Sequence, residues 1–201
     1  MRWGSPTPSG PRPFGSPESS FGAAEHHGSE AGRYGDPVHD IRMIGEDDRE
    51  GIRAFLQERW GDELMVVHEE IVRPAELPGF VAGDPGDPRH LRGLVTYRIR
   101  GGACEIVTLD SLDEGRGVGS ELVASVALAA RSAGCRRLWL VTTNDNERAL
   151  AWYTRRGFKV CAVRVGAVDR ARERKPSIRR VNAETGVPIR DEIELERLVE
   201  P

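Results

Sequence analysis

The stretch that decides the fold is residues 104–120, which read Cys-Glu-Ile-Val-Thr-Leu-Asp-Ser-Leu-Asp-Glu-Gly-Arg-Gly-Val-Gly-Ser. Residues 105–112 are rich in β-formers and pass into a turn with three glycines, Gly115, Gly117 and Gly119. An apolar-periodic helix begins directly after this turn. A strand that leads through such a turn into a helix N-terminus forms an anion site, because the first-turn N–H groups and the helix dipole favour negative charge. The stretch therefore predicts a ligand that carries phosphate.

Two common phosphate-binding loops do not fit this turn. The dinucleotide fingerprint requires a third glycine three residues after the second, and Ser120 or Leu122 occupies that position, depending on which pair of glycines starts the count. A Walker-type loop ends in Gly-Lys-Ser or Gly-Lys-Thr, and the sequence contains neither triplet. The turn therefore matches neither of these loops, and a plain strand–turn–helix connection that carries glycines stays an alternative.

A second stretch, residues 146–158, follows the first after one helix and one strand. Asn146, Ala149 and Tyr153 lie at i, i+3 and i+7, so they share one stripe of a predicted helix. Gly157 is a candidate C-terminal cap of that helix. The predicted order from the turn onward is helix 118–133, strand 137–143, helix 146–156 and strand 158–165.

Together the two stretches resemble the coenzyme-A motifs of the GNAT (GCN5-related N-acetyltransferase) superfamily. The first resembles its pyrophosphate loop, Gln/Arg-x-x-Gly-x-Gly/Ala, with Gly117 and Gly119 in place and Glu114 where the family usually has Gln or Arg. The second resembles Asn-x-x-Ala-x-x-x-Tyr-x-x-x-Gly-Phe, with its tyrosine at Tyr153. The resemblance implies an α/β protein with the GNAT acyl-CoA N-acyltransferase fold. In that fold a mixed, mostly antiparallel central sheet is flanked by helices and splayed at the CoA-binding strand.

The resemblance also implies acetyl-CoA as co-substrate. Its pyrophosphate would contact the loop, and its pantetheine arm would pair with the main chain at the end of the preceding strand. The implied coenzyme-binding residues are Leu109, Asp110, Ser111, Glu114, Gly115, Arg116, Gly117, Val118, Gly119, Ser120, Asn146, Ala149 and Tyr153. We expect no metal, since the sequence contains no Cys-x-x-Cys and no histidine pair at ligand spacing.

The reaction that the resemblance implies is direct attack of a primary amine on the acetyl thioester. The leaving thiolate benefits from a nearby acid, and Tyr153 matches the family's tyrosine. A phenol with an ordinary pKa of about 10 remains protonated at neutral pH. The oxyanion needs a donor already in place, and a main-chain N–H of residues 109–111 is the candidate.

An amine of the lysine type must also lose a proton to a base. Glu105 matches the glutamate that some GNAT members carry at this point of the strand. Strict alternation places Glu105 on the face of Val107 and Leu109, where burial raises the pKa of a carboxyl group and suits a base. Asp110 and a water relay are the alternatives.

Composition sets the domain organisation of this 201-residue chain. Residues 1–37 contain 7 Gly, 6 Pro and 6 Ser without apolar periodicity, so we expect a disordered tail before a GNAT domain over residues 38–201. The net charge of −3 gives no indication of nucleic-acid binding, and no run is long enough to span a membrane. Three cysteines, Cys104, Cys135 and Cys161, in apolar surroundings indicate buried, reduced thiols and a cytoplasmic protein.

The remaining sequence predicts the edges of the sheet. A helix that carries Ile52 and Leu56 should be capped by Asp47 or Asp48. The other expected elements are strand 41–44, strand 65–67, loop 74–78, strand 79–82, a turn at 84–88, and a hairpin of strands 91–99 and 104–112 around Gly101 and Gly102. Residues 191–199 alternate apolar and acidic side chains, which predicts a closing, half-exposed strand.

Residues 164–180 contain seven basic and two acidic side chains. Four interpretations remain open: a solvated helix face, a lid over the acceptor site, a contact with the 3′-phosphate of CoA, and a contact with nucleic acid, which the overall charge makes the weakest. The acceptor is a small molecule or protein that the sequence does not identify, and a homodimer is compatible with it. The alternative to an enzyme is a non-catalytic acyl-CoA-binding sensor or interaction domain, which the departure at Glu114 motivates.

Overall fold

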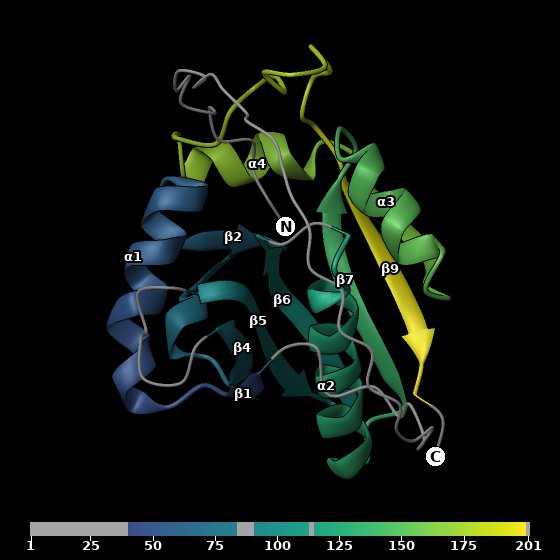
Figure 1. Ribbon diagram of the computed structural model, residues 1–201. Coiled ribbons are helices and arrows are strands. Elements are labelled where there is room, and N and C mark those ends of the chain that lie inside the picture. The colour runs from purple at the N-terminus through teal and green to yellow at the C-terminus, as the bar shows by residue number, and fades with distance from the viewer. Residues whose placement is uncertain (1–39, 84–90, 113–114, 200–201) are drawn as a thin grey trace, which may run out of the picture. The chain divides into compact units, whose positions relative to one another are not determined.

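The structure is a computed structural model that describes residues 40–83, 91–112 and 115–199. The predicted tail at 1–37, the predicted turn at 84–88 and Glu114 lie outside these residues. The strands are β1 (Ile41–Met43), β2 (Met65–Val67), β3 (Glu70–Val72), β4 (Gly79–Gly83), β5 (Leu91–Arg100), β6 (Ala103–Ser111), β7 (Arg137–Thr143), β8 (Lys159–Arg164) and β9 (Glu192–Leu198) (Figure 1). The helices are α1 (Arg49–Trp60), α2 (Val118–Ser132), α3 (Glu147–Thr154) and α4 (Ala167–Arg174), with 3₁₀ turns at Glu46–Asp48 and Pro74–Glu76, the second within the predicted loop 74–78.

Seven strands form one sheet in the order β1-β4-β5-β6-β7-β9-β8, and β2 and β3 form a separate hairpin. All described neighbours in the sheet are antiparallel except β6 and β7, which are parallel. β6 pairs with β7 from Ala103 to Ile106, whereas β6 itself continues to Ser111 and β7 to Thr143. The described pairing therefore ends before the strands do, which confirms the mixed, mostly antiparallel sheet with a splay at β6.

The hairpin of β5 and β6 turns at Gly101 and Gly102, whose φ angles of 57° and 72° favour glycine. Thr96 pairs with Thr108 but Tyr97 pairs with Ile106, so Val107 is an extra residue in β6. This bulge reverses the alternation that follows it.

Because of the bulge, Leu109 packs with Cys104 and Ile106 in the core under α2, while Asp110 contacts Trp60 of α1 on the opposite face. The prediction that Glu105 and Leu109 share a face is therefore wrong.

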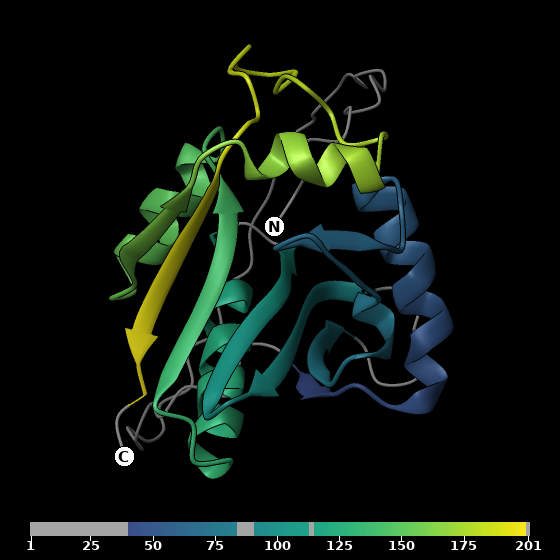
Figure 2. The same cartoon turned by 180° about the vertical axis from the view of Figure 1, so that it is seen from behind.

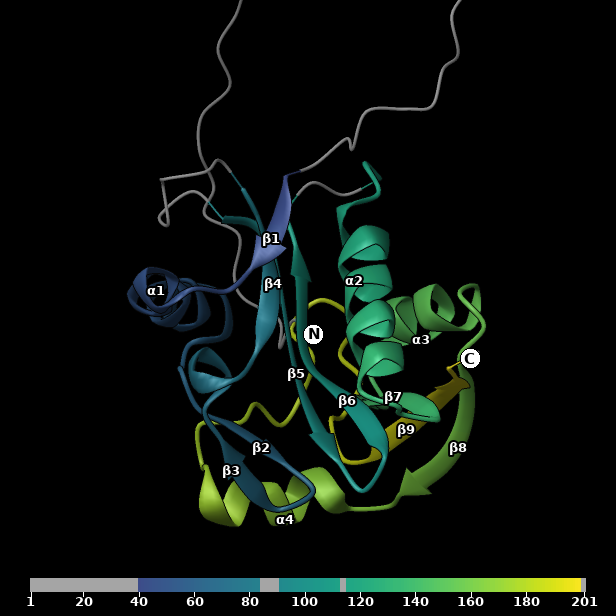
Figure 3. The same ribbon diagram turned by 90° about the horizontal axis from the view of Figure 1, so that it is seen from below.

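Helices cover both faces of the sheet. Figure 3 shows α1 on one side and α2 and α3 on the other. The α2 side holds the main core, where Val118, Leu122 and Val126 are fully buried. α2 approaches the sheet closely at Gly93 of β5, because a Cβ atom there would lie 2.7 Å from the Val118 side chain. On the other face, α4 packs beside β2.

β9 differs most from expectation. It lies within the sheet between β7 and β8, as Figure 2 shows, rather than closing it at an edge. Glu192 and Glu194 are consequently buried, with 5% and 7% of their surface exposed. The prediction of a closing, half-exposed strand is therefore wrong, although its bounds are close.

Two smaller predictions hold only in part. Asp48 occupies the predicted N-cap position of α1, but its side chain makes no capping hydrogen bond; it accepts from the Gly45 N–H of the preceding 3₁₀ turn at 2.7 Å and forms a two-point ion pair with Arg42. All three cysteines are free, but only Cys104 and Cys135 are buried, whereas Cys161 on β8 is exposed.

Candidate active site

A cavity of about 740 Å³ lies where the predicted coenzyme-binding residues meet. A volume of this size suits a cofactor-sized ligand, since small-molecule sites usually measure roughly 300–1,000 Å³. Ten of the thirteen predicted residues line it: Leu109, Asp110, Ser111, Gly115, Gly117, Gly119, Ser120, Asn146, Ala149 and Tyr153. Arg116 is exposed and Val118 is buried in the core, and neither lines the cavity.

The glycine turn lines one part of this cavity. Gly117 is the N-cap of α2 and has φ of 92°, a conformation that few side chains tolerate. Its carbonyl accepts the first hydrogen bonds of the helix, from the Ser120 and Glu121 N–H groups at 2.8 and 3.1 Å. The earlier N–H groups of the first turn have no acceptor within the helix, which is the arrangement that binds anions.

Arg156, at the end of α3, adds a cation that sequence reasoning missed. It lines the cavity and donates to Ser120 Oγ from Nε at 3.1 Å and from Nη2 at 2.7 Å. Its guanidinium lies over the Trp152 ring, 3.5 Å from the centroid, and donates to the Trp152 carbonyl. The missed signal is helical spacing: Arg156 continues the stripe three residues after Tyr153.

Tyr153 lines the same cavity and is 2% exposed. Its ring packs edge-on against Trp152 and Phe158, with centroid distances of 4.9 and 5.3 Å. Its hydroxyl has no hydrogen-bond partner within the described residues. Burial raises the pKa of Tyr153 above its ordinary value, and nearby Asp110 raises it further. Both shifts favour the protonated form of the phenol.

Two other predicted residues have structural partners. The Asn146 side chain caps α3 by accepting from the Ala149 N–H at 3.1 Å. Asp110 is buried and accepts from Trp60 Nε1 at 2.5 Å and from Arg59 at 3.4 Å. These contacts fix both groups at the wall of the cavity.

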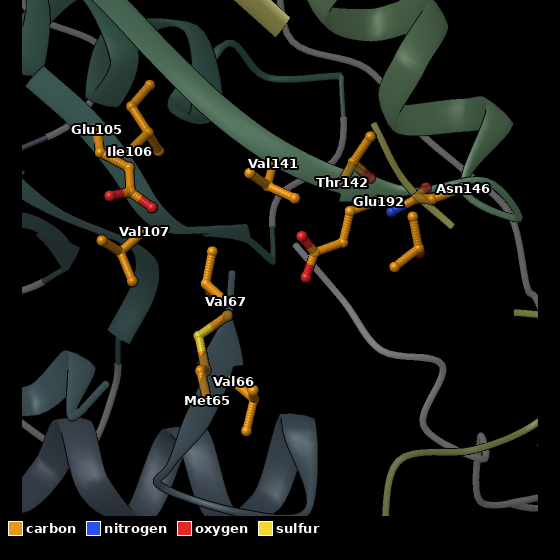
Figure 4. Close-up of a pocket in the computed structure, with 11 residues that line it drawn as sticks. Met65, Val66, Val67, Glu105, Ile106, Val107, Val141, Thr142, Asn146 and Glu192 are labelled. Carbon is orange, nitrogen blue, oxygen red and sulfur yellow. The ribbon is translucent and has the colours of Figure 1, made fainter. Parts of the chain in front are cut away.

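A second, smaller cavity of about 40 Å³ lies between the diverging ends of β6 and β7 (Figure 4). Glu105 lines this cavity and not the large one, so the two predicted catalytic residues are in different cavities. Asn146 lines both, which makes it the point where the two adjoin. The remaining wall residues are Met65, Val66, Val67, Ile106, Val107, Val141, Thr142, Thr143 and Glu192.

Glu105 is 3% exposed and is hydrogen bonded by Arg98, which also donates to Glu70 at 2.7 Å. Burial raises the pKa of Glu105, and the Arg98 guanidinium opposes that shift. Glu105 therefore faces the cavity as one half of a buried ion pair.

Comparison with known proteins identifies the family of this chain. The sequence pattern described as the Acetyltransferase (GNAT) family matches residues 43–158. This chain belongs to the GNAT acetyltransferase family. The uncharacterized protein YdhI of Bacillus subtilis (strain 168) is 41% identical over 146 residues, which are 73% of this chain and 89% of YdhI.

Solved structures share the fold at low identity. An acetyltransferase from Bacillus subtilis in complex with CoA is 17% identical, with a TM-score of 0.57 over 81% of this chain and 99% of the other. A GNAT family acetyltransferase from Elizabethkingia anophelis with acetyl-CoA bound is 16% identical, with a TM-score of 0.56 and the same coverage. The GNAT fold predicted from the two motifs is therefore confirmed.

Within this GNAT fold, the basic stretch at 164–180 forms hydrogen bonds and ion pairs with other parts of the chain. Arg172 is buried and donates to Asp169 and to the carbonyl groups of Ile178, Arg179 and Ile189. Among the described residues that line the large cavity, none is one of these seven basic residues. The interpretation of this stretch as a solvated helix face is wrong for Arg172 and for the buried apolar side of α4.

α4 contacts the segment around β2, and the residues of β2 line the small cavity. Lys175 donates to the Leu64 carbonyl and pairs with Asp62 at 3.0 Å, and Arg170 pairs with Glu69 at 2.8 Å. These contacts connect α4 to the residues that flank β2 and to the β2–β3 turn. The role of the stretch as a lid over the acceptor site stays a prediction.

The described residues contain no group of His, Cys, Asp and Glu suited to a metal ion. Among the described helices, none combines the length and the apolar character needed to cross a membrane.

Proposed function

We propose that this GNAT protein is an N-acetyltransferase that transfers an acetyl group from acetyl-CoA to a primary amine. One observation carries the proposal. One cofactor-sized cavity brings together a glycine turn at a helix N-terminus, the end of β6 beyond its pairing with β7, and a buried hydroxyl with no partner among the described residues.

The binding roles follow from position. The glycine turn and Arg156 would hold the pyrophosphate, because both place N–H donors at one end of the cavity. The main chain at residues 109–111 would contact the pantetheine arm in the manner of an added strand. A coenzyme bound in this way would have its thioester near Tyr153 and Asn146, and Asn146 lines both cavities.

The chemistry requires three groups. A main-chain N–H at residues 109–111 would stabilise the oxyanion, and Tyr153 would protonate the departing thiolate. The amine would approach through the small cavity, whose carboxylates include Glu105, the base predicted from the sequence. The new C–N bond replaces the C–S bond, one amine proton goes to the thiol and another to a carboxylate and then to solvent. A cytoplasmic setting fits three free cysteines.

The experiment is thiol release from acetyl-CoA by the full chain with a panel of primary amines, with the acetylated product identified by mass spectrometry. Amine-dependent, saturable thiol release is the expected result. Coenzyme binding without thiol release for any amine would instead identify a non-catalytic acyl-CoA-binding domain.

A further inference from the structure

We propose that Glu192 of β9 binds the ammonium group of a small, unbranched primary amine in the cavity between β6 and β7 and accepts its proton. This inference rests on the proposed acetyl transfer and adds to it the acceptor class and the residue that recognises it. Glu192 was not among the site residues predicted from the sequence.

Unpartnered acceptors mark the position of the amine. The Glu192 side chain is 6% exposed, and its Oε2 atom forms no hydrogen bond with any described residue. Thr142 Oγ1, on the neighbouring strand β7, is also buried without a described partner. Both residues line the small cavity. A primary ammonium has three N–H donors, so it can satisfy the carboxylate and the hydroxyl together.

The surroundings of Glu192 contain no ready counter-ion. The His68 main-chain N–H hydrogen bonds the carboxylate, and His68 Nε2 lies 3.6 Å from Oε2. Burial lowers the pKa of His68, and the Arg164 guanidinium lowers it further, which disfavours a charged ring beside Glu192. No lysine or arginine nitrogen of the described residues lies within 4.0 Å of Glu192.

The nearest arginines are engaged elsewhere. Arg164 of β8 contacts Glu194 at 3.3 Å, and Arg170 of α4 contacts Glu69 at 2.8 Å. Burial raises the pKa of Glu192, which these two arginines oppose and Glu69 reinforces. A cationic ligand supplies the missing charge, whereas Glu105 already has Arg98.

Figure 4 shows the Glu105 and Glu192 carboxylates entering the same space from opposite sides, with Val67 between them. The apolar walls at Met65, Val107 and Val141 suit a short hydrocarbon chain. One water-sized position takes roughly 10–15 Å³, so the cavity of about 40 Å³ admits an amino group and about two or three carbons. Carboxylates on both sides disfavour an acceptor that is itself anionic.

The proton transfer balances without another reactant. Glu192 takes one proton from the ammonium, and the neutral nitrogen attacks the thioester carbon. As the C–S bond breaks, a second nitrogen proton is lost and the sulfur gains one from Tyr153, which is reprotonated. The net products are the amide, the thiol and one proton released to solvent.

The test compares Glu192→Gln with the wild-type chain, using propylamine as acceptor. Glutamine keeps the shape and can still accept from the His68 N–H but lacks the charge. We expect kcat/KM for propylamine to fall about 100-fold, with acetyl-CoA affinity unchanged. The loss should shrink as pH nears the amine's own pKa of about 10, where the neutral amine no longer needs the carboxylate. The matched control is Glu196→Gln, on the same strand but outside both cavities and paired with Arg137.

Three results would overturn the inference. The first is a Glu192→Gln chain within about three-fold of wild type with the same pH profile. The second is equal or greater activity with β-alanine or tert-butylamine than with propylamine. The third is a wild-type chain that binds acetyl-CoA but releases no thiol with short alkylamines, which leaves the proposed function standing. Failure to bind acetyl-CoA at all would instead refute the proposed function. If Glu192→Gln does not fold, Thr142→Val tests the same site and should raise KM for the amine.

Discussion

Replacing Tyr153 with phenylalanine separates the chemistry of the site from its stability. The ring keeps its edge-on contacts with Trp152 and Phe158, and only a buried hydroxyl without a described partner is removed. A buried, unsatisfied polar group costs about 1–3 kcal/mol. We therefore expect Tyr153→Phe to be as stable as wild type or more stable by about 1 kcal/mol, a rise in Tm of about 2–4 °C.

Turnover should change in the opposite direction. Without the phenol, the thiolate leaves unprotonated, and loss of a general acid lowers kcat by about 100-fold. Because burial raises the pKa of Tyr153, the wild-type hydroxyl keeps its proton beyond its ordinary value, so kcat should show no loss of this acid below pH of about 10. Thiol release gives kcat, calorimetry gives the acetyl-CoA affinity, and thermal denaturation gives Tm.

The matched control is Tyr97→Phe. Tyr97 is also buried and stacks on Phe80, but it lines neither cavity, so its loss should leave kcat unchanged. A Tyr153→Phe chain with wild-type kcat would refute the role of Tyr153 as acid. A large loss of stability would refute the description of its hydroxyl as unpartnered.

Three further predictions concern the surroundings of the site. Arg156→Ala should weaken acetyl-CoA binding at least about 10-fold by calorimetry, because a charge-assisted contact is worth about 1.5–3 kcal/mol. The control Arg155→Ala, at an exposed position, should leave the affinity unchanged. Equal affinities of the two variants would exclude Arg156 from the phosphate site. Burial raises the pKa of Glu192 in the folded chain, so its ionisation lowers the free energy of unfolding as pH rises above the ordinary pKa of a glutamate. Glu192→Gln should therefore melt higher than wild type at neutral pH, with the difference vanishing below pH of about 4, and an equal gain at both pH values would contradict this. Lys175→Met removes the contacts with Asp62 and the Leu64 carbonyl, so denaturant titration should show a free energy of unfolding lower by about 1–2 kcal/mol. The same variant should raise KM for the amine. An unchanged KM would show that α4 does not control the small cavity.

The sequence predicted most of the residues that line the large cavity because its signals there are local. Gly117 is needed where the backbone adopts positive φ, and Asn146 and Tyr153 fall on one stripe of one helix. A residue's position on such a stripe follows from chain spacing alone. The same spacing rule could have predicted that Arg156 lies near this cavity.

The small cavity depends on contacts between distant segments. An alternating strand looks the same whether its polar face meets solvent or a cavity, so Glu192 was predicted to be half exposed. Its burial depends on β9 lying between β7 and β8, which no local pattern encodes. The bulge at Val107 similarly depends on pairing with β5, and it reverses the side on which Leu109 lies.

Calorimetric titration of acetyl-CoA into the full chain tests the central claim most directly, because it asks whether the cavity of about 740 Å³ is a coenzyme site. The account predicts binding at one site with a Kd of roughly 1–100 µM. No detectable heat of binding at coenzyme concentrations of about 1 mM would contradict it, and the likeness to GNAT acetyltransferases would then be one of fold alone.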